Sequence, residues 1–124
     1  MKKLLCVREL GGYPDFSPLY RRLGCDIISA QGMRKAMAAL KKHAPQLLIA
    51  EFNYAPTYGA RISTVEALLA AVQTCKEKPR VLLFTEPPHL QHLPLLEKQY
   101  GVLEALAYPI DENALAEWLA RKVE

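Results

Sequence analysis

The sequence of 124 residues predicts one α/β domain, in which a parallel five-stranded sheet lies between two layers of helices as a three-layer sandwich. Two observations lead to this prediction. Short apolar stretches alternate with helical stretches five times along the chain, and most of these apolar stretches run on without intervening polar residues. Continuous apolar strands joined by helices are typical of a parallel sheet that is covered on both faces.

The third predicted strand, residues 47–52, is the clearest element. Four apolar residues run without a break to Glu51, which places an acid at the end of a buried strand. The other four strands are predicted at residues 3–7, 26–29, 80–84 and 103–107. Glycines and prolines separate these strands from the helices, as expected for turns.

The helices are predicted from capping residues and apolar spacing. Ser17 is expected to cap the first helix, and Ser63 with Glu66 has the spacing of a capping box before the third. The second helix has one apolar stripe, made of Met33, Ala36, Met37 and Leu40. Pro94 lies inside the fourth helical stretch, 90–100, and therefore predicts a late start or a kink. Asp111 is expected to cap the last helix.

Right-handed crossovers between five strands favour the flavodoxin-like order 2-1-3-4-5. In that order the first and third strands are neighbours, and the carboxyl ends of the strands form the natural binding edge. The polar residues at these ends are Arg8, Glu9, Glu51, Asn53, Thr85 and Tyr108. The sequence therefore predicts that they gather at one edge of the sheet.

The composition argues against several classes of protein. The net charge of +3 is mild, and the densest basic segment is interpreted as a solvated helix face, so no direct contact with nucleic acid is expected. No apolar run approaches a membrane span, and the start of the chain does not fit a secretory signal, which predicts a cytoplasmic protein. Cys6, Cys25 and Cys75 are expected to be small buried side chains without disulfides.

Other residue patterns do not predict a catalytic or metal site. His89 and His92 are spaced by three, but two ligands are an incomplete metal set, so exposed polar histidines are expected. Gly11 and Gly12 are interpreted as a flexible loop, because phosphate-cradling glycines directly precede a helix. No serine or cysteine has a patterned base. We therefore expect no catalytic residue, no metal and no cofactor.

The sequence resembles the receiver domains of bacterial two-component response regulators. The resemblance covers nearly the whole chain, so residues 1–124 are expected to form one receiver-like domain. It rests on element order, on Glu51-Phe52-Asn53 where the family has Asp-x-Asn, on Thr85 after the fourth strand, and on the Gly101…Tyr108-Pro109 ending. The resemblance also implies a cis peptide bond before Pro109.

The resemblance implies aspartyl phosphorylation assisted by Mg²⁺, but the matching positions depart from that chemistry. Glu51 replaces the acceptor aspartate, and its carboxylate stands one methylene farther out. Arg8 and Glu9 replace the acid pair that helps to hold the metal, and Tyr108 replaces the lysine that neutralises phosphoryl charge. Only Thr85 and Asn53 agree. These departures predict that Arg8 pairs with Glu51 in place of a metal ion.

The leading interpretation is a pseudo-receiver, a non-catalytic protein-interaction module in signalling that is not phosphorylated at Glu51. Its protein partner is expected at the strand-edge loops or on the surface of helix 4, strand 5 and helix 5, where a homodimer is also plausible. Tyr54, Tyr58 and Arg61 form either an interaction loop or a lid over the pocket. Two alternatives remain open: a small-molecule or anion sensor that uses the pocket, and a residual Mg²⁺-binding receiver.

Overall fold

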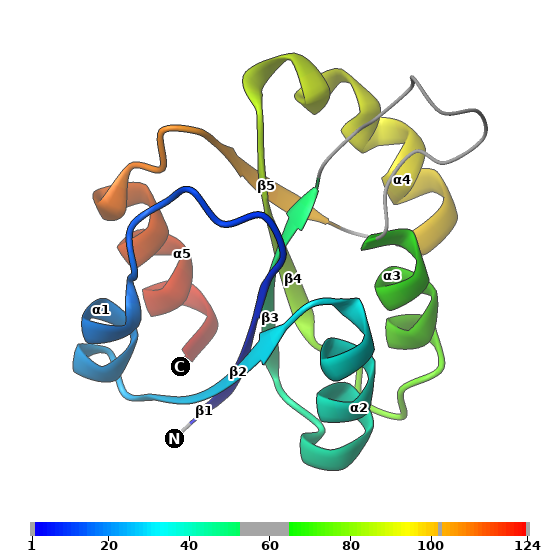
Figure 1. The fold of residues 1–124 in the computed structure, drawn as a ribbon, viewed down its shortest axis with the longest axis horizontal. Helices are drawn as coiled ribbons and strands as arrows, with labels where there is room; N and C mark the ends of the chain where they lie inside the picture. Colours follow the sequence, from blue (N-terminus) through cyan, green and yellow to red (C-terminus); the bar gives the residue numbers. More distant parts are fainter. Residues whose placement is uncertain (1, 53–64, 102, 124) are drawn as a thin grey trace.

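A single sheet of five parallel strands forms the centre of the molecule, in the predicted order β2-β1-β3-β4-β5. The computed structural model describes residues 2–52, 65–101 and 103–123 (Figure 1). The strands are β1 (Lys2–Arg8), β2 (Cys25–Gln31), β3 (Leu47–Phe52), β4 (Arg80–Thr85) and β5 (Glu104–Ala107). The flavodoxin-like topology is therefore confirmed.

Helices cover both faces of this sheet. They are α1 (Ser17–Arg22), α2 (Met33–His43), α3 (Val65–Gln73), α4 (Leu93–Tyr100) and α5 (Glu112–Val123), with a 3-10 helix, η2 (Pro87–His92), before α4. In Figure 1, α1 and α5 lie on one side of the sheet, and α2, α3 and α4 lie on the other. Among the described residues, no helix combines the length and the apolar character needed to cross a bilayer.

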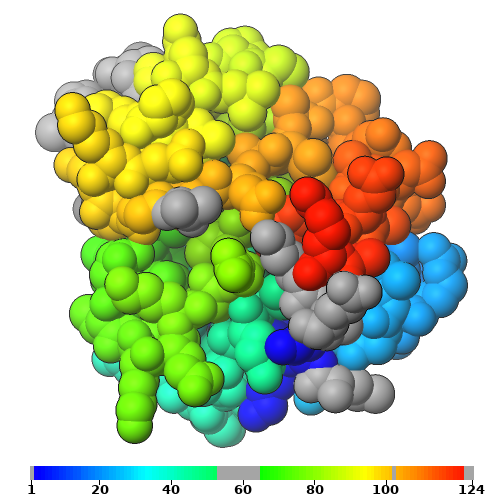
Figure 2. Space-filling model, turned by 180° about the vertical axis from the view of Figure 1, so that it is seen from behind, coloured from blue at the N-terminus to red at the C-terminus, as the bar shows by residue number. Residues whose placement is uncertain are grey.

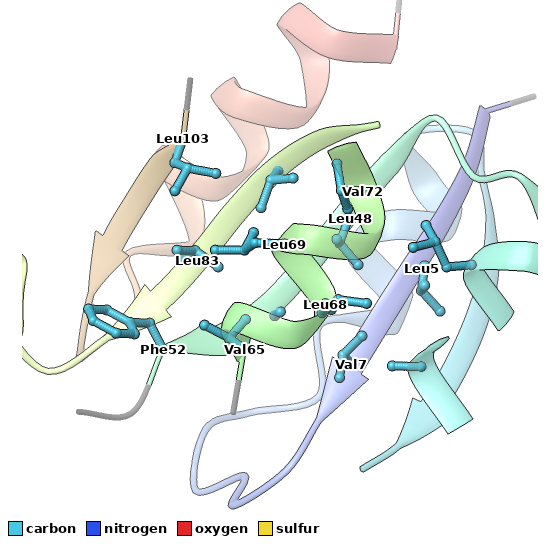
Figure 3. Packing of buried hydrophobic residues seen from close by; sticks show 14 of the residues in the cluster. Leu5, Val7, Leu48, Phe52, Val65, Leu68, Leu69, Val72, Leu83 and Leu103 are labelled. Atoms are coloured by element: carbon cyan, nitrogen blue, oxygen red, sulfur yellow. The ribbon is translucent and has the colours of Figure 1, made fainter. Parts of the chain in front are cut away.

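The two faces of the sheet bury separate apolar clusters. On one face, α3 packs Val65, Leu68 and Leu69 against the strands, beside Leu5 and Leu83 (Figure 3). On the other face, the cluster comprises residues of α1 and α5 with the opposite side chains of the strands, among them Leu19, Leu82, Leu115 and Trp118. Because every residue of β3 is buried, any polar group on that strand needs an internal partner.

Several local predictions are confirmed. Pro94 lies in the first turn of α4, after the separate 3-10 segment, which is the predicted late start. Asp111 accepts the N–H of Asn113 at 3.0 Å and so caps α5. The Tyr108–Pro109 peptide bond is cis, as the resemblance implies.

Other local predictions need correction. Ser17 is the first residue of α1, and the cap position belongs to Phe16, which makes no side-chain cap bond. The Asp15 carboxylate accepts the Ser17 N–H at 2.9 Å. Of the three free cysteines, Cys25 is buried, whereas Cys6 and Cys75 are only partly buried. The predicted Ser63–Glu66 capping box lies partly outside the described residues, since Ser63 is not among them.

Candidate functional site

Glu51 lies at the junction of the two central strands. Its side chain is only 1% exposed, and Glu51 and Thr85 are the buried polar or charged residues of the described chain. The pairing of β1 with β3 extends to Cys6 and Ile49. After this point the N–H groups of the segment that follows β1 are no longer paired with the backbone of β3. They face the side chain of Glu51 instead.

The Glu51 carboxylate is held by three consecutive backbone N–H groups and one hydroxyl. Glu9 donates to Oε2 at 2.9 Å, Leu10 donates to Oε1 at 3.0 Å, and Gly11 is shared between both oxygens at 3.3 Å. The Tyr13 hydroxyl donates to Oε2 at 3.0 Å. We call these four donors the amide cage. Since a carboxylate offers about four lone-pair sites, the cage uses the acceptor capacity of Glu51.

Gly11 and Gly12 allow the chain to form this cage. Their φ angles are +71° and +84°, in the left-handed region that residues with a side chain rarely adopt. These angles turn the chain directly after the third N–H donor, so that Tyr13 comes back to the same carboxylate. Successive backbone N–H groups that point at one anion are a known way of binding anions in proteins. The interpretation of this pair as a flexible loop therefore needs correction: Gly11 donates to Glu51, and the anion in the cradle is the protein's own carboxylate.

Arg8 does not pair with Glu51, and this expectation from the sequence is wrong. The guanidinium carbon of Arg8 lies 4.4 Å from the centre of the Tyr13 ring, in a cation–π contact. The physical reason is that the amide cage already satisfies the carboxylate. Arg8 stays partly exposed, and the cost of removing its charge from water as well is avoided.

Tyr13 and Tyr108 form the wall of the site. Their rings are stacked with centres 5.9 Å apart, and the edge contact between Tyr13 and Phe84 has centres 5.2 Å apart. Burial, and then the charge of Glu51, raise the pKa of both tyrosines above the ordinary value. Both rings are therefore neutral near pH 7, and the position of the family's lysine contributes no positive charge.

The hydroxyl of Thr85 is bound to backbone. Its Oγ1 donates to the carbonyl oxygen of Phe52 at 3.1 Å, while the Thr85 carbonyl accepts the N–H of Tyr108 at 2.9 Å. These bonds join β3, β4 and the end of β5. Thr85 thus acts here as a link between strands, and its proton is not directed at a ligand.

These residues do not fit a magnesium ion. Mg²⁺ requires oxygen ligands in near-octahedral geometry, but the position of one family acid is Arg8, and both oxygens of Glu51 already accept hydrogen bonds. In the part of the chain that the structure describes, no group of three His, Cys, Asp or Glu side chains is arranged to hold a metal. The rings of His89 and His92 have centres 6.4 Å apart.

The space beside the amide cage is small. A cavity of about 70 Å³ is lined by Arg8, Tyr13, Asp15 and Phe84 among others. Pockets that bury a small organic ligand usually have volumes of about 300–1,000 Å³. As far as the described residues form it, this cavity has room for water or a very small ion.

The structure brings together Arg8, Glu9, Glu51, Thr85 and Tyr108, as the sequence predicts. Pro109, also predicted for this site, follows Tyr108 through the cis peptide bond. The remaining predicted site residues Asn53, Tyr54, Tyr58 and Arg61 lie outside the described residues. Sequence reasoning missed Tyr13 and the N–H groups of Leu10 and Gly11. The available signal was a glycine pair in the loop after the first strand, followed at once by a tyrosine.

Comparison with solved structures identifies the fold. A response regulator receiver domain from Clostridium thermocellum is 13% identical with a TM-score of 0.73, and the match covers 99% of this chain and 94% of that one. The chemotaxis protein CheY4 of Vibrio cholerae is 20% identical with a TM-score of 0.69 and 98% coverage of both chains.

A third similar structure is the receiver domain of the sensor histidine kinase PA1611 from Pseudomonas aeruginosa, described with a magnesium ion coordinated in its active-site cleft. It is 14% identical with a TM-score of 0.69, covering 98% of this chain and 97% of that one. No protein-family model matches the sequence, and the search of curated proteins found no match. The structural likeness extends over nearly all of each chain, and the protein has the fold of response-regulator receiver domains.

Proposed function

We propose that residues 1–124 are a pseudo-receiver, a cytoplasmic protein-interaction module in signalling that works without phosphorylation and without catalysis. The observation that carries this proposal is the amide cage. Glu51 occupies the position of the phosphorylated aspartate, and its carboxylate accepts hydrogen bonds from Glu9, Leu10, Gly11 and Tyr13. A nucleophile in this state has no free lone pair directed at an incoming phosphoryl group.

The surrounding charges support the same proposal. Phosphoryl transfer depends mainly on positioning and on cations that neutralise the developing negative charge. In the Pseudomonas receiver a magnesium ion is coordinated in the active-site cleft, whereas here Arg8 occupies the position of a metal ligand and contacts Tyr13. Tyr108 supplies an aromatic ring where the family has a lysine, and that ring stacks on Tyr13.

The proposed partner surface is the α4–β5–α5 face, with the loops at the carboxyl edge as a second possibility. Leu95 of α4 is 55% exposed, and Leu90 in the preceding 3-10 segment is 38% exposed. Extended exposed apolar surface is typical of regions that bind proteins, and these two leucines add apolar area to this part of the molecule. A homodimer through the same face is part of this proposal.

The test of phosphorylation is an NMR titration with beryllofluoride and Mg²⁺, and separately with a small phosphodonor. We expect no localised change in the amide signals of Glu9 and Glu51. The control is the double variant Arg8→Asp with Glu51→Asp, which restores an acid beside Glu9 and shortens the acceptor. After circular dichroism shows that it is folded, this variant should respond to Mg²⁺. A localised response of the unmodified protein would overturn the proposal.

Self-association is tested by sedimentation over a range of protein concentrations. We expect a concentration-dependent dimer that Leu95→Glu weakens, because the substitution places a charge in an apolar contact. The matched control is Leu10→Glu, since Leu10 is also exposed but belongs to the loop after β1. A protein that stays monomeric at all concentrations would rule out the homodimer.

A further inference from the structure

The amino edge of the sheet, opposite the amide cage, carries a hollow lined by basic side chains. Its volume is about 330 Å³, and its charged lining residues are Lys2, Glu77, Lys78, Arg80 and Arg121. Lys2 and Arg80 begin β1 and β4, and Arg121 lies near the end of α5. At this edge the first residues of β1 and the last turns of α5 approach the α2–β3 and α3–β4 connections (Figure 2).

A second hollow adjoins the first. Its volume is about 450 Å³, and it shares Ala44, Pro45 and Glu77 with the basic hollow. It lies between the ends of α2 and α3, where Leu40 and Cys75 provide apolar surface. Lys41 and Lys76 add two further cations. We call the two hollows together the amino-edge groove.

The cations of the amino-edge groove lack acidic partners. Six basic side chains share the groove with one acid, Glu77. None of the six forms an ion pair with an acid in the described ranges 2–52, 65–101 and 103–123, and Lys78 donates to the neutral side chain of Gln73 at 3.2 Å. Charges of one sign in a hollow concentrate the electric field there and attract ligands of the opposite sign.

The form of the groove favours an extended chain over a compact phosphate. Phosphate sites usually collect backbone N–H groups at a helix N-terminus, but α2 and α3 reach this edge with their C-termini, which have no free N–H groups to offer. The cations instead sit on long, flexible stems spread over two joined hollows. Spaced carboxylates would meet such cations singly, and the surface around Leu40 and Cys75 would accept an apolar side chain.

We infer that the amino-edge groove binds an acidic peptide segment of a partner protein. The inference does not depend on the state of Glu51, because the groove lies at the other edge of the sheet. It adds a second interaction surface to the α4–β5–α5 face. A protein with both surfaces can join two partners at once, so the domain would act as an adaptor.

The test is an NMR titration with a short synthetic peptide that has glutamates at alternate positions and one central leucine. We expect saturable shifts in the amides of Ala44, Gln46, Glu77 and Arg80, weakening as salt is added. The double variant Arg80→Glu with Arg121→Glu should bind this peptide at least about tenfold more weakly, because like charges then face each other.

The matched control is Arg34→Glu with Lys35→Glu, which makes the same change in net charge on exposed residues of α2. This control should reduce binding by less than about threefold, since screening weakens distant exposed charges. A peptide with glutamine in place of glutamate should not bind. Equal weakening of both double variants would overturn the inference by showing a general charge effect.

Three other results would overturn the proposed occupant. Stronger saturable binding of a short DNA duplex or of inorganic polyphosphate at the same amides would identify the groove as a phosphate-binding surface. Shifts of the groove amides with protein concentration alone would identify a second copy of this chain as the occupant. Absence of any saturable shift at low salt would show that the groove takes no acidic chain.

Discussion

At the carboxyl edge of the sheet, four donors surround the Glu51 carboxylate, whereas at the amino edge Arg80 and Arg121 have no acidic partner among the described residues. The first edge is where parallel α/β sheets normally bind ligands. In this protein Glu51 and Thr85 at that edge have hydrogen-bond partners within the protein. The basic side chains at the opposite edge have no acidic partner among the described residues.

This contrast shows that the position of a site in a fold and the chemistry of that site are separate properties. The fold brings Glu51, Thr85 and Tyr108 together at the expected place. The local contacts then use each of them internally: Glu51 in the amide cage, Thr85 on a backbone carbonyl, and Tyr108 in a ring stack. The comparison of the two edges can be tested by substitutions.

Replacing Glu51 should have the largest effect. Glu51→Ala leaves the cage donors of Glu9, Leu10, Gly11 and Tyr13 without their acceptor. Because an unsatisfied buried donor costs about 1–3 kcal/mol and entering water recovers part of this, we expect a loss of about 2–4 kcal/mol in the free energy of unfolding. Urea denaturation measures it.

The control for this substitution is Glu86→Ala, an exposed glutamate at the same edge of the sheet. Exposed substitutions away from special contacts usually change stability by no more than about 0.5 kcal/mol. If Glu51→Ala proves as mild as Glu86→Ala, the amide cage does not hold the loop after β1 against β3.

The glycine pair should give the next largest effect. Gly11→Ala and Gly12→Ala each force alanine into the left-handed region, at a cost of about 1–2 kcal/mol. A Cβ at Gly11 would also lie 3.3 Å from Nη1 of Arg8, whereas a Cβ at Gly12 meets no atom within 4 Å. We therefore expect Gly11→Ala to destabilise more, as measured by thermal unfolding. Equal losses of stability in the two variants would show that the Arg8 side chain moves away from the added Cβ without a cost in free energy.

Tyr13 should make stability depend on alkaline pH. Its pKa is raised in the folded protein by burial and by Glu51, above a value of 10.0 without these effects. The unfolded chain therefore loses this proton first as pH rises, and stability falls above about pH 10. The free energy of unfolding should fall by less than about 1.4 kcal/mol per pH unit, which is the limit for one proton, because solvent screens a half-buried ring.

Tyr13→Phe removes this proton and should flatten the alkaline slope. At neutral pH the same substitution should cost about 1 kcal/mol, since one hydrogen bond to Glu51 is lost while the ring contacts stay. The comparison is Tyr20→Phe, because Tyr20 is buried and its pKa is also raised, but the hydroxyl has no bond to Glu51. A slope that Tyr13→Phe leaves unchanged would contradict this assignment.

The smallest effects should come from arginines at the two edges. Arg8→Ala removes the cation–π contact with Tyr13 and should cost about 0.5–1 kcal/mol. Arg80→Ala should change stability by less than about 0.5 kcal/mol, or raise it, because it relieves repulsion between unpaired cations. Both are measured by urea denaturation. A loss of several kcal/mol for Arg8→Ala would restore the ion pair with Glu51 that the sequence suggests.

Most of the fold could be predicted from the sequence, because its signals are local. Four apolar residues before Glu51 define β3, and Pro94 marks where α4 begins. The errors concern contacts at the ends of elements. The cap of α1 is Phe16, one residue before the predicted Ser17, and the Asp15 carboxylate accepts the Ser17 N–H. Such short-range competition between side chains is not visible from residue preferences alone.

For the site, the sequence could predict which residues come together, but it could not predict which groups contact each other. The residues that end the strands are readable from the sequence, since the topology brings them together. The partner of Glu51 could not be predicted in this way, because charge alone suggests Arg8. The real donors are mostly backbone N–H groups, which almost every residue possesses. Their direction depends on the backbone conformation of the whole segment after β1, which includes the turn at Gly11 and Gly12. A glycine in a sequence indicates conformational freedom without indicating which conformation is used.

The amide cage also has a consequence for local motion. The N–H groups of Glu9, Leu10 and Gly11 belong to a connecting segment, where amide hydrogens usually exchange rapidly with solvent. Here each is bonded to a carboxylate on the central strand. Their exchange should therefore require separation of this segment from β3, and their protection should approach that of the strand. Hydrogen exchange would then group these three residues with the slowest-opening unit of the protein.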